Sequence, residues 1–244
     1  MDQRLALIAL LLAPLVSAAP SDVTLETPRF IERDYRLVGG RYQPSWITCD
    51  GATAVAIISK VGTNQVRIES FLKLTSSSTK TALYVLGAGD GAAGSVYYGL
   101  TPSAGQSYLR LTQARNYDDA RRQPASLHTP NLELNCGRVI GTRFYAVTSR
   151  RSVSIWNDPS GGLHYVSFDY AGAREGQKPS LSLGGGTMLG RGAGRVSYVF
   201  LNGQFTYRVD ATSQPPSAAI RVYRCAALLQ TEVPRAYADV RDQP

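Results

Sequence analysis

Hydrophobic residues recur at every second position in short runs along this chain, and residues that favour turns separate the runs. A period of two is typical of β-strands, because successive side chains of a strand point to opposite faces. No window after residue 20 keeps the period of about 3.6 residues that an amphipathic helix requires. We therefore predict an all-β protein with an antiparallel β-sandwich or barrel-like architecture.

The dipeptide Asn202-Gly203 gives the clearest hairpin signal. It separates the alternating runs 195–201 and 204–210, and Asn-Gly tolerates the two positive φ angles of a type I′ turn. A two-residue loop at this position fixes the register of both strands. The pairs expected on an aromatic face are Phe200/Phe205, Tyr198/Tyr207 and Val196/Val209. The pairs expected on the other face are Ser197/Arg208 and Val199/Thr206, with Arg195 opposite Asp210 at the open end.

A second hairpin is predicted at Ser152–Trp156 and Leu163–Tyr170, because the segment between these runs contains Pro159 and two glycines. Other short runs rich in β-branched and aromatic residues are predicted to be strands as well. They are 55–59, 66–72, 81–86, 95–100, 107–112, 131–135, 144–148, 180–183, 220–225 and 227–231.

Two parts of the chain resemble each other and indicate a duplicated β unit. Residues 86–111 and 183–209 each combine a glycine-rich segment, a strand containing tyrosine and a Gly-Gln step into the next strand. Each copy continues to a strand that ends in cysteine. We predict an N-terminal extension at 19–49, β units at 50–137 and 138–231, and a C-terminal tail at 232–244. One shared barrel and two small domains both fit this division.

The first 18 residues have the pattern of a signal peptide. Arg4 precedes the apolar run 5–16, and Ser17-Ala18 supplies the small residues that a signal peptidase recognises. The run is shorter than the roughly 20 residues that a bilayer-spanning helix needs. We expect cleavage after Ala18, export to the periplasm, the cell surface or the medium, and no transmembrane anchor in the mature chain.

Export makes a disulfide the expected state of two of the three cysteines. The candidates are Cys49, Cys136 and Cys225. Spacing alone does not fix the connectivity, but a Cys49–Cys136 bond would close the first predicted unit. We therefore favour that pair over the other two.

The chain is basic, with a formal net charge of +8, and 22 of its 26 basic residues are arginine. A basic exported protein meets partners such as anionic polysaccharides, lipid headgroups, extracellular nucleic acid or another envelope protein. Arginine and tyrosine together can hold and stack such ligands. The candidate binding residues are Arg195, Arg208, Arg221, Arg224, Tyr198 and Tyr207. The competing interpretation is that the arginines are solvated surface charges and the tyrosines ordinary strand residues.

Motifs of known enzyme classes give no site here, and we predict neither a cofactor nor a metal. The glycine-rich segments 87–91 and 184–186 precede strands, whereas a phosphate-binding loop opens a helix, so we interpret them as turns or bulges. Ser77-x-x-Lys80 matches the motif of penicillin-recognising enzymes only formally, because that motif starts a helix. His128, predicted in a loop, and His164, predicted to begin a strand, do not form a zinc-type pair.

We interpret the chain as an exported, non-enzymatic binding or envelope-associated β protein that recognises an anionic polymer or surface. One alternative is a structural or assembly partner that acts through sheet edges. The other alternative is a hydrolase, which would show a cleft that joins His128 or His164 to a carboxylate or a serine. The charged segment 116–124, with Asp118-Asp119 beside Arg121-Arg122, is interpreted as a surface loop.

Overall fold

The computed structural model describes residues 29–30, 34–51, 54–73, 79–86, 95–101, 106–112, 125–138, 142–172, 178–192 and 194–239. These ranges contain twenty strands and no helix, which confirms the all-β prediction. The first eleven strands are β1 (Arg29–Phe30), β2 (Asp34–Val38), β3 (Arg41–Pro44), β4 (Ile47–Asp50), β5 (Ala54–Lys60), β6 (Gln65–Leu72), β7 (Thr79–Leu86), β8 (Ser95–Thr101), β9 (Tyr108–Thr112), β10 (Ala125–Thr129) and β11 (Leu132–Arg138). The remaining nine are β12 (Thr142–Val147), β13 (Arg151–Asn157), β14 (Leu163–Asp169), β15 (Leu181–Gly192), β16 (Arg195–Asn202), β17 (Phe205–Ser213), β18 (Pro216–Arg224), β19 (Ala227–Glu232) and β20 (Ala236–Asp239).

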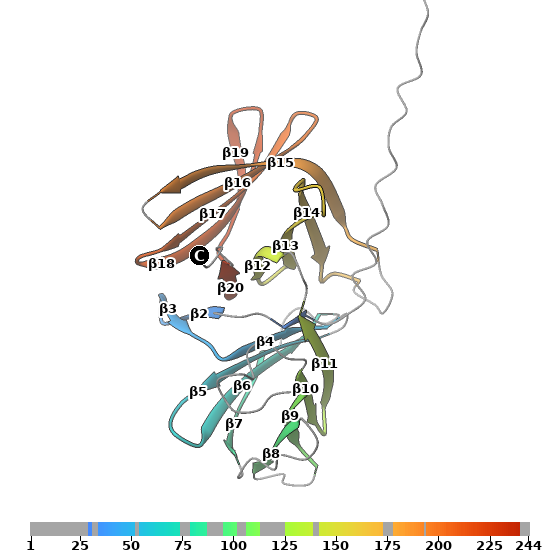
Figure 1. The fold of residues 1–244 in the computed structure, drawn as a ribbon, viewed down its shortest axis with the longest axis vertical. Coiled ribbons are helices and arrows are strands. Elements are labelled where there is room, and N and C mark those ends of the chain that lie inside the picture. Colours follow the sequence, from blue (N-terminus) through green and yellow to red (C-terminus); the bar gives the residue numbers. More distant parts are fainter. Residues whose placement is uncertain are drawn as a thin grey trace, which may run out of the picture.

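The strands form two sheets that lie one above the other in Figure 1. The lower sheet is a closed barrel with the order β1-β11-β10-β9-β8-β7-β6-β5-β4. The upper one, the second sheet, has eleven strands in the order β19-β18-β17-β16-β15-β14-β13-β12-β20-β2-β3. The strands therefore form two separate sheets and not one shared barrel, the two arrangements that the repeat pattern allowed.

The interior of the barrel is a hydrophobic core. On β5 the inward side chains are Ala54, Ala56 and Ile58, and they pack with Trp46, Leu100, Leu109 and Leu127. The intervening residues Val55 and Ile57 are buried as well, on the outside of the barrel. A strand that is buried on both faces needs a continuous apolar run, and this explains the unbroken sequence Ala-Val-Ala-Ile-Ile of β5.

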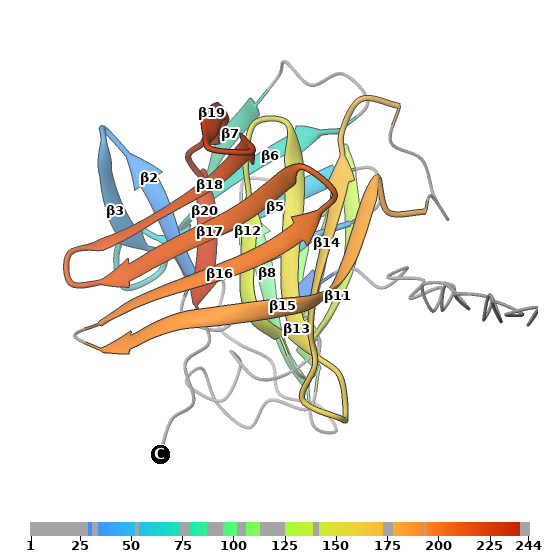
Figure 2. The same ribbon diagram turned by 90° about the horizontal axis from the view of Figure 1, so that it is seen from above.

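The second sheet curls around a core of its own, which contains Phe144, Ile155, Tyr198, Phe200 and Val209. Figure 2 shows β15–β18 in front of the other strands when the molecule is seen from above. The glycine-rich segment 184–186 lies inside β15, where the pairing with β14 shifts register and Gly185 has a φ of +69°. The segment is thus a bulge in a strand, one of the two interpretations, turn or bulge, that the sequence allowed.

A third hydrophobic cluster joins the barrel to the second sheet. Val55, Ile57 and Phe71 of the barrel pack against Tyr145, Val147, Tyr170, Ala236 and Ala238 of the sheet. Two ion pairs flank this contact: Arg36 to Glu69, with Nη1 and Oε1 2.6 Å apart, and Lys73 to Asp50, with Nζ and Oδ1 2.5 Å apart. The Lys73 ammonium also lies 5.1 Å from the centre of the Tyr170 ring, on the other side of the interface. The two sheets therefore share a buried boundary that is both apolar and charged.

Both ends of the described chain contribute to the second sheet. β2 and β3 lie in the predicted N-terminal extension, and β20 lies in the predicted C-terminal tail. β20 pairs with β12 on one side and with β2 on the other, so that Tyr35 lies opposite Tyr237 and their rings stack with centroids 5.5 Å apart. β2 and β20 have no strong strand pattern in the sequence. They are nevertheless central strands, because neighbours on both sides form hydrogen bonds with them.

The β16–β17 hairpin forms with a register that differs from the predicted one. Its loop is Gly203–Gln204, so Asn202 is still paired, opposite Phe205. Gly203 has a φ of +58°, and the only non-glycine residue with positive φ in the described ranges is Cys225. This fits a type II′ turn, which requires glycine at its first central position, and not the type I′ turn that Asn-Gly suggested.

The shifted loop moves every predicted pair by two residues, so the predicted pairs are wrong while the predicted faces are right. The observed pairs on the buried face are Phe200/Tyr207, Tyr198/Val209 and Val196/Ala211. Arg195 lies opposite Thr212, and Asp210 lies opposite Ser197, so the predicted Arg195–Asp210 pair does not form in the register. Each residue keeps its face because a shift of two preserves the alternation.

We expect Gly203→Val to lower the free energy of unfolding by about 1–3 kcal/mol, because a β-branched residue is strained at positive φ. The control is Asn202→Ala, which we expect to change it by less than about 0.5 kcal/mol since Asn202 is an exposed strand residue. Urea denaturation of both variants measures the difference. Equal losses would contradict the type II′ assignment.

Candidate functional site

The six predicted binding residues divide between the two faces of the second sheet. Arg195, Arg208 and Arg221 alternate with the buried residues of β16, β17 and β18, so they belong to the outer face, which points away from the sheet's own core. Tyr198 and Tyr207 lie on the inner face. Neighbours in a strand point to opposite sides, so Tyr207 and Arg208 cannot contribute to one flat surface.

The structure brings together two of the four arginines. Arg208 of β17 lies directly opposite Arg221 of β18. Arg195 lies opposite Thr212, four residues further along β17, or about 13 Å at the rise of an extended strand. Arg224 lies at the end of β18, where its Nε donates to Oε1 of Gln204 at 2.9 Å.

Asp210 holds Arg208 and Arg221 side by side. Nε of Arg208 donates to Oδ1 of Asp210 at 2.9 Å, and a guanidinium nitrogen of Arg221 donates to Oδ2. The Ser197 hydroxyl also donates to Oδ1 of Asp210 and accepts from Nη2 of Arg208 at 3.2 Å. We call these four residues, Ser197, Arg208, Asp210 and Arg221, the arginine cluster. It spans three neighbouring strands, so the sheet fixes its geometry.

The arginine cluster carries a net positive charge at the surface. Two guanidinium groups face one carboxylate, and the side chains of Arg208 and Arg221 are 45% and 34% exposed. Each guanidinium has five N–H donors, and the contacts with Asp210 and Ser197 use only part of them. Asp210 offsets the repulsion between these two like charges, which lie directly opposite each other in the sheet.

The two predicted tyrosines are part of the core. Tyr198 is 2% exposed, and Tyr207 packs against the same hydrophobic cluster, with its ring centroid 5.8 Å from that of Tyr165. Neither ring is on the face that carries the arginine cluster. Tyr223, two residues after Arg221 on β18 and outside the predicted set, is half-buried on that outer face. The two-residue alternation of side chains along β18 was sufficient to place Tyr223 on the same face as Arg221.

His164 forms a contact network in the turn of the β13–β14 hairpin. Its Nε2 lies 2.8 Å from Oδ2 of Asp158, and its ring stacks on Trp156 with centroids 4.4 Å apart. The Ser160 hydroxyl donates to Oδ1 of Asp158 at 2.6 Å, and the Gly162 amide donates to the same oxygen at 2.8 Å. The pKa of Asp158 lies below its usual range because hydrogen bonds stabilise the carboxylate. The largest contribution comes from Ser160, followed by His164 and Gly162.

These contacts join His164 to a carboxylate, one feature that the hydrolase alternative predicts, but they do not form a serine–histidine–carboxylate triad. A nucleophilic serine needs the histidine between itself and the carboxylate, whereas Ser160 bonds to Asp158 directly. His128 lies in strand β10, which corrects the predicted loop, and its ring stacks on Tyr108 across the ladder to β9. Its Nδ1 is 3.9 Å from Oε2 of Glu133. Within the described ranges, both histidines thus act as cross-strand packing residues.

The structure gives two of the cysteines a defined state. Cys49 is disulfide-bonded and fully buried in the barrel core, and Cys225 is a free, exposed thiol in the β18–β19 turn. The side chain of Cys136 lies outside what the structure describes, so the Cys49–Cys136 pair stays a prediction.

Several other predicted features also lie outside the described residues. They are the signal peptide at 1–18, the glycine-rich segment 87–91, Ser77 with the side chain of Lys80, and the charged loop 116–124. Among the described residues, no group of three or more His, Cys, Asp or Glu side chains is arranged to hold a metal ion. Nowhere in those ranges does the chain form a helix with the length and hydropathy to cross a bilayer.

Comparison with known proteins gives no relative: no family model, curated protein or solved structure matches the chain.

Proposed function

We propose that the protein is an exported binding protein that recognises an anionic polymer or surface through the arginine cluster. The observation that supports this proposal is the pair of arginines placed opposite each other, half-exposed, with one carboxylate between them. Guanidinium groups present planar arrays of donors to carboxylate, sulfate and phosphate. Asp210 orients both groups and leaves outward donors for a partner.

The surroundings of the cluster fit an extended partner. The cluster lies on the outer face of the β16–β18 region, which Figure 2 shows in front of the rest of the molecule. Tyr223 follows Arg221 on this face, and Thr206 and Thr231 lie opposite these two residues on the neighbouring strands. A row of guanidinium, aromatic and hydroxyl groups on an open face suits contact along a polymer or a charged surface. The formal charge of +8 favours the same class of partner.

A second candidate function is assembly through the edge of the second sheet. β19 is the last strand of the sheet order and pairs only with β18. Its residues Leu228 and Leu229 are 54% and 56% exposed. An edge strand with exposed apolar side chains is a template for pairing with another chain. The register shift between β18 and β19 weakens this template, and we therefore rank assembly after anion binding.

The test is a binding screen against heparin, phosphatidylglycerol vesicles and single-stranded oligo(dT) at low and moderate salt. We expect Arg208→Gln/Arg221→Gln to weaken binding about tenfold or more and to reduce the salt slope on oligo(dT) by about 1.4, or about 0.7 per lost contact. The matched control is Arg41→Gln/Arg150→Gln, which removes the same charge from exposed positions elsewhere. Asp210→Asn should strengthen binding of the anionic ligands, because it frees both guanidinium groups from the carboxylate.

Two results would overturn the proposal. One is that the wild type binds none of the three ligands. The other is that the two double variants lose affinity equally, since the effect would then follow net charge alone. Melting curves of all variants verify that the sheet is intact.

A further inference from the structure

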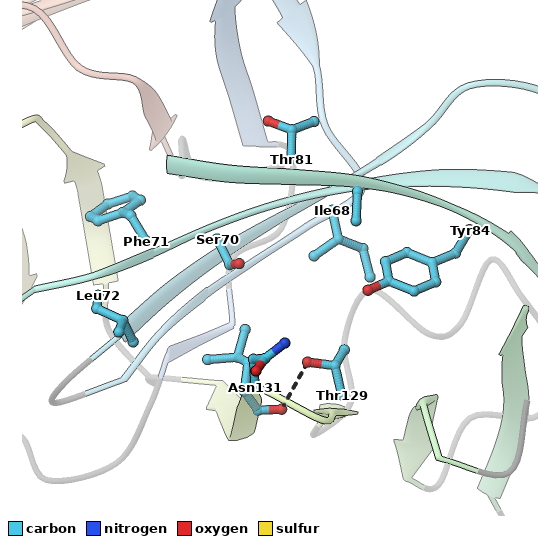
Figure 3. A pocket seen from close by; sticks show the side chains of 10 residues that line it. Ile68, Ser70, Phe71, Leu72, Thr81, Tyr84, Thr129 and Asn131 are labelled. Carbon is cyan, nitrogen blue, oxygen red and sulfur yellow. Dashed lines mark hydrogen bonds between the residues drawn. The ribbon is translucent and has the colours of Figure 1, made fainter. Parts of the chain in front are cut away.

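At one end of the barrel, here called the open end, the described residues leave a cavity of about 340 Å³. Figure 3 shows the cavity between β6 and β7 on one side and the turn between β10 and β11 on the other. Along β6 the inward side chains change from fully buried Val66, through Ile68, to half-buried Ser70. The hydrophobic core thus fills the barrel at one end and stops short of the other.

Small side chains leave this space unfilled. The inward positions at the open end carry Ser70, Ala82 and Thr129, whereas Trp46, Tyr98 and Leu100 fill the interior elsewhere. A closed barrel has strands at fixed separation, so the backbone cannot move in to fill a gap. The cavity therefore follows from small side chains on a closed barrel.

The described side chains that line the cavity are apolar or polar without charge. Ile68 and Leu132 supply apolar surface, and Ser70, Tyr84, Thr129 and Asn131 supply hydroxyl and amide groups. In Figure 3 the Tyr84 hydroxyl and the Asn131 amide both lie at the space between β6 and the β10–β11 turn. None of the lining side chains that the structure describes is charged. Among these side chains an ionic ligand would lose its hydration without gaining a counter-charge.

We infer that the open end of the barrel binds an uncharged, amphipathic small molecule. Its apolar part would pack on Ile68 and Leu132, and its polar part would bond to Tyr84 and Asn131. The volume of about 340 Å³ is at the lower end of the range for small-molecule sites, which indicates a ligand of roughly one to two rings. This site lies on the barrel, and it is independent of the arginine cluster on the second sheet.

The experiment compares 2-naphthol with 2-naphthoate by calorimetric titration at neutral pH. The two probes share a ring system, but only the second is charged. We expect saturable binding of one 2-naphthol and at least tenfold weaker binding of 2-naphthoate. Tyr84→Phe should lower the affinity for 2-naphthol severalfold. Arg208→Gln/Arg221→Gln should leave this affinity unchanged.

Asn131→Trp tests the location, because it adds a large side chain at the mouth in an exposed turn. We expect at least a tenfold loss of 2-naphthol affinity. The matched control is Asn64→Trp in the exposed turn between β5 and β6, outside the cavity lining, with a change below twofold. Should Asn131→Trp fail to fold, Ser70→Leu blocks the same space from β6. The inference is overturned by the absence of saturable 2-naphthol binding, by equal affinity for the two probes, or by equal affinity in the two tryptophan variants.

Discussion

Replacing Lys73 by methionine should lower the free energy of unfolding by about 3–5 kcal/mol, because the change leaves a buried carboxylate without its counter-charge. Lys73 and Asp50 are 4% and 7% exposed, and the ammonium also lies over the Tyr170 ring of the second sheet. The variant therefore loses an ion pair within the barrel and a contact across the boundary between the two sheets. Chemical denaturation followed by tyrosine and tryptophan fluorescence measures the loss.

The matched control for this prediction is the double variant Lys73→Met/Asp50→Asn. It removes both charges, so most of the penalty for a lone buried charge disappears. We expect the double variant to be more stable than Lys73→Met alone. A double variant that is less stable than the single one would show that the pair acts through packing and not through charge.

Gly186→Val should be the second strongly destabilising change, with a loss of about 3 kcal/mol, at the upper end of the range for overpacked cores. A Cβ atom at Gly186 would lie 2.1 Å from Cε1 of Phe200, and Phe200 is completely buried. A ring in the middle of a core has no free space to rotate into. A fall of the melting temperature by about 6–12 °C is expected for a chain of this size.

Gly184→Ala is the control from the same strand. Its Cβ would meet the His164 ring at 3.6 Å, an ordinary contact, so we expect a change below about 0.5 kcal/mol. Phe200→Leu should recover part of the stability lost in Gly186→Val, since the two positions are coupled through one space. Failure of this rescue, or equal losses at the two glycines, would contradict the assigned packing.

Local alternation was sufficient to predict most of the long strands and the faces of the β16–β17 hairpin, but for β15 it predicted only the segment 180–183. The shifted loop at Gly203–Gln204 changed the partners and preserved the faces. The short strands β1, β2, β3, β4, β10 and β20 were not predicted. β20 has the sequence Ala-Tyr-Ala-Asp, which carries little hydrophobic signal. It is buried because β12 and β2 pair with it from distant parts of the chain, and local patterns contain no information on such pairs.

The candidate site was only partly predictable for the same reason. Alternation alone separates Tyr207 from Arg208, so the six-residue set could not form one face. The arginine pair, by contrast, depends on the register of β17 and β18, whose loop Gln214–Pro215 lacks an Asn-Gly or Asp-Gly signal. Asp210 was expected to bond to Arg195, and the true register gives it Arg208 and Arg221.

The pairing of β2 with β20 makes the second sheet a discontinuous domain, with the barrel strands β4–β11 inserted between its first and later parts. During synthesis from the N-terminus, all barrel strands emerge by Arg138, about 100 residues before β20. Until β20 arrives, no strand connects the β2–β3 hairpin to β12, and such long-range pairings form slowly. Truncation near the C-terminus would therefore separate β2–β3 from the rest of the sheet while leaving the barrel strands complete.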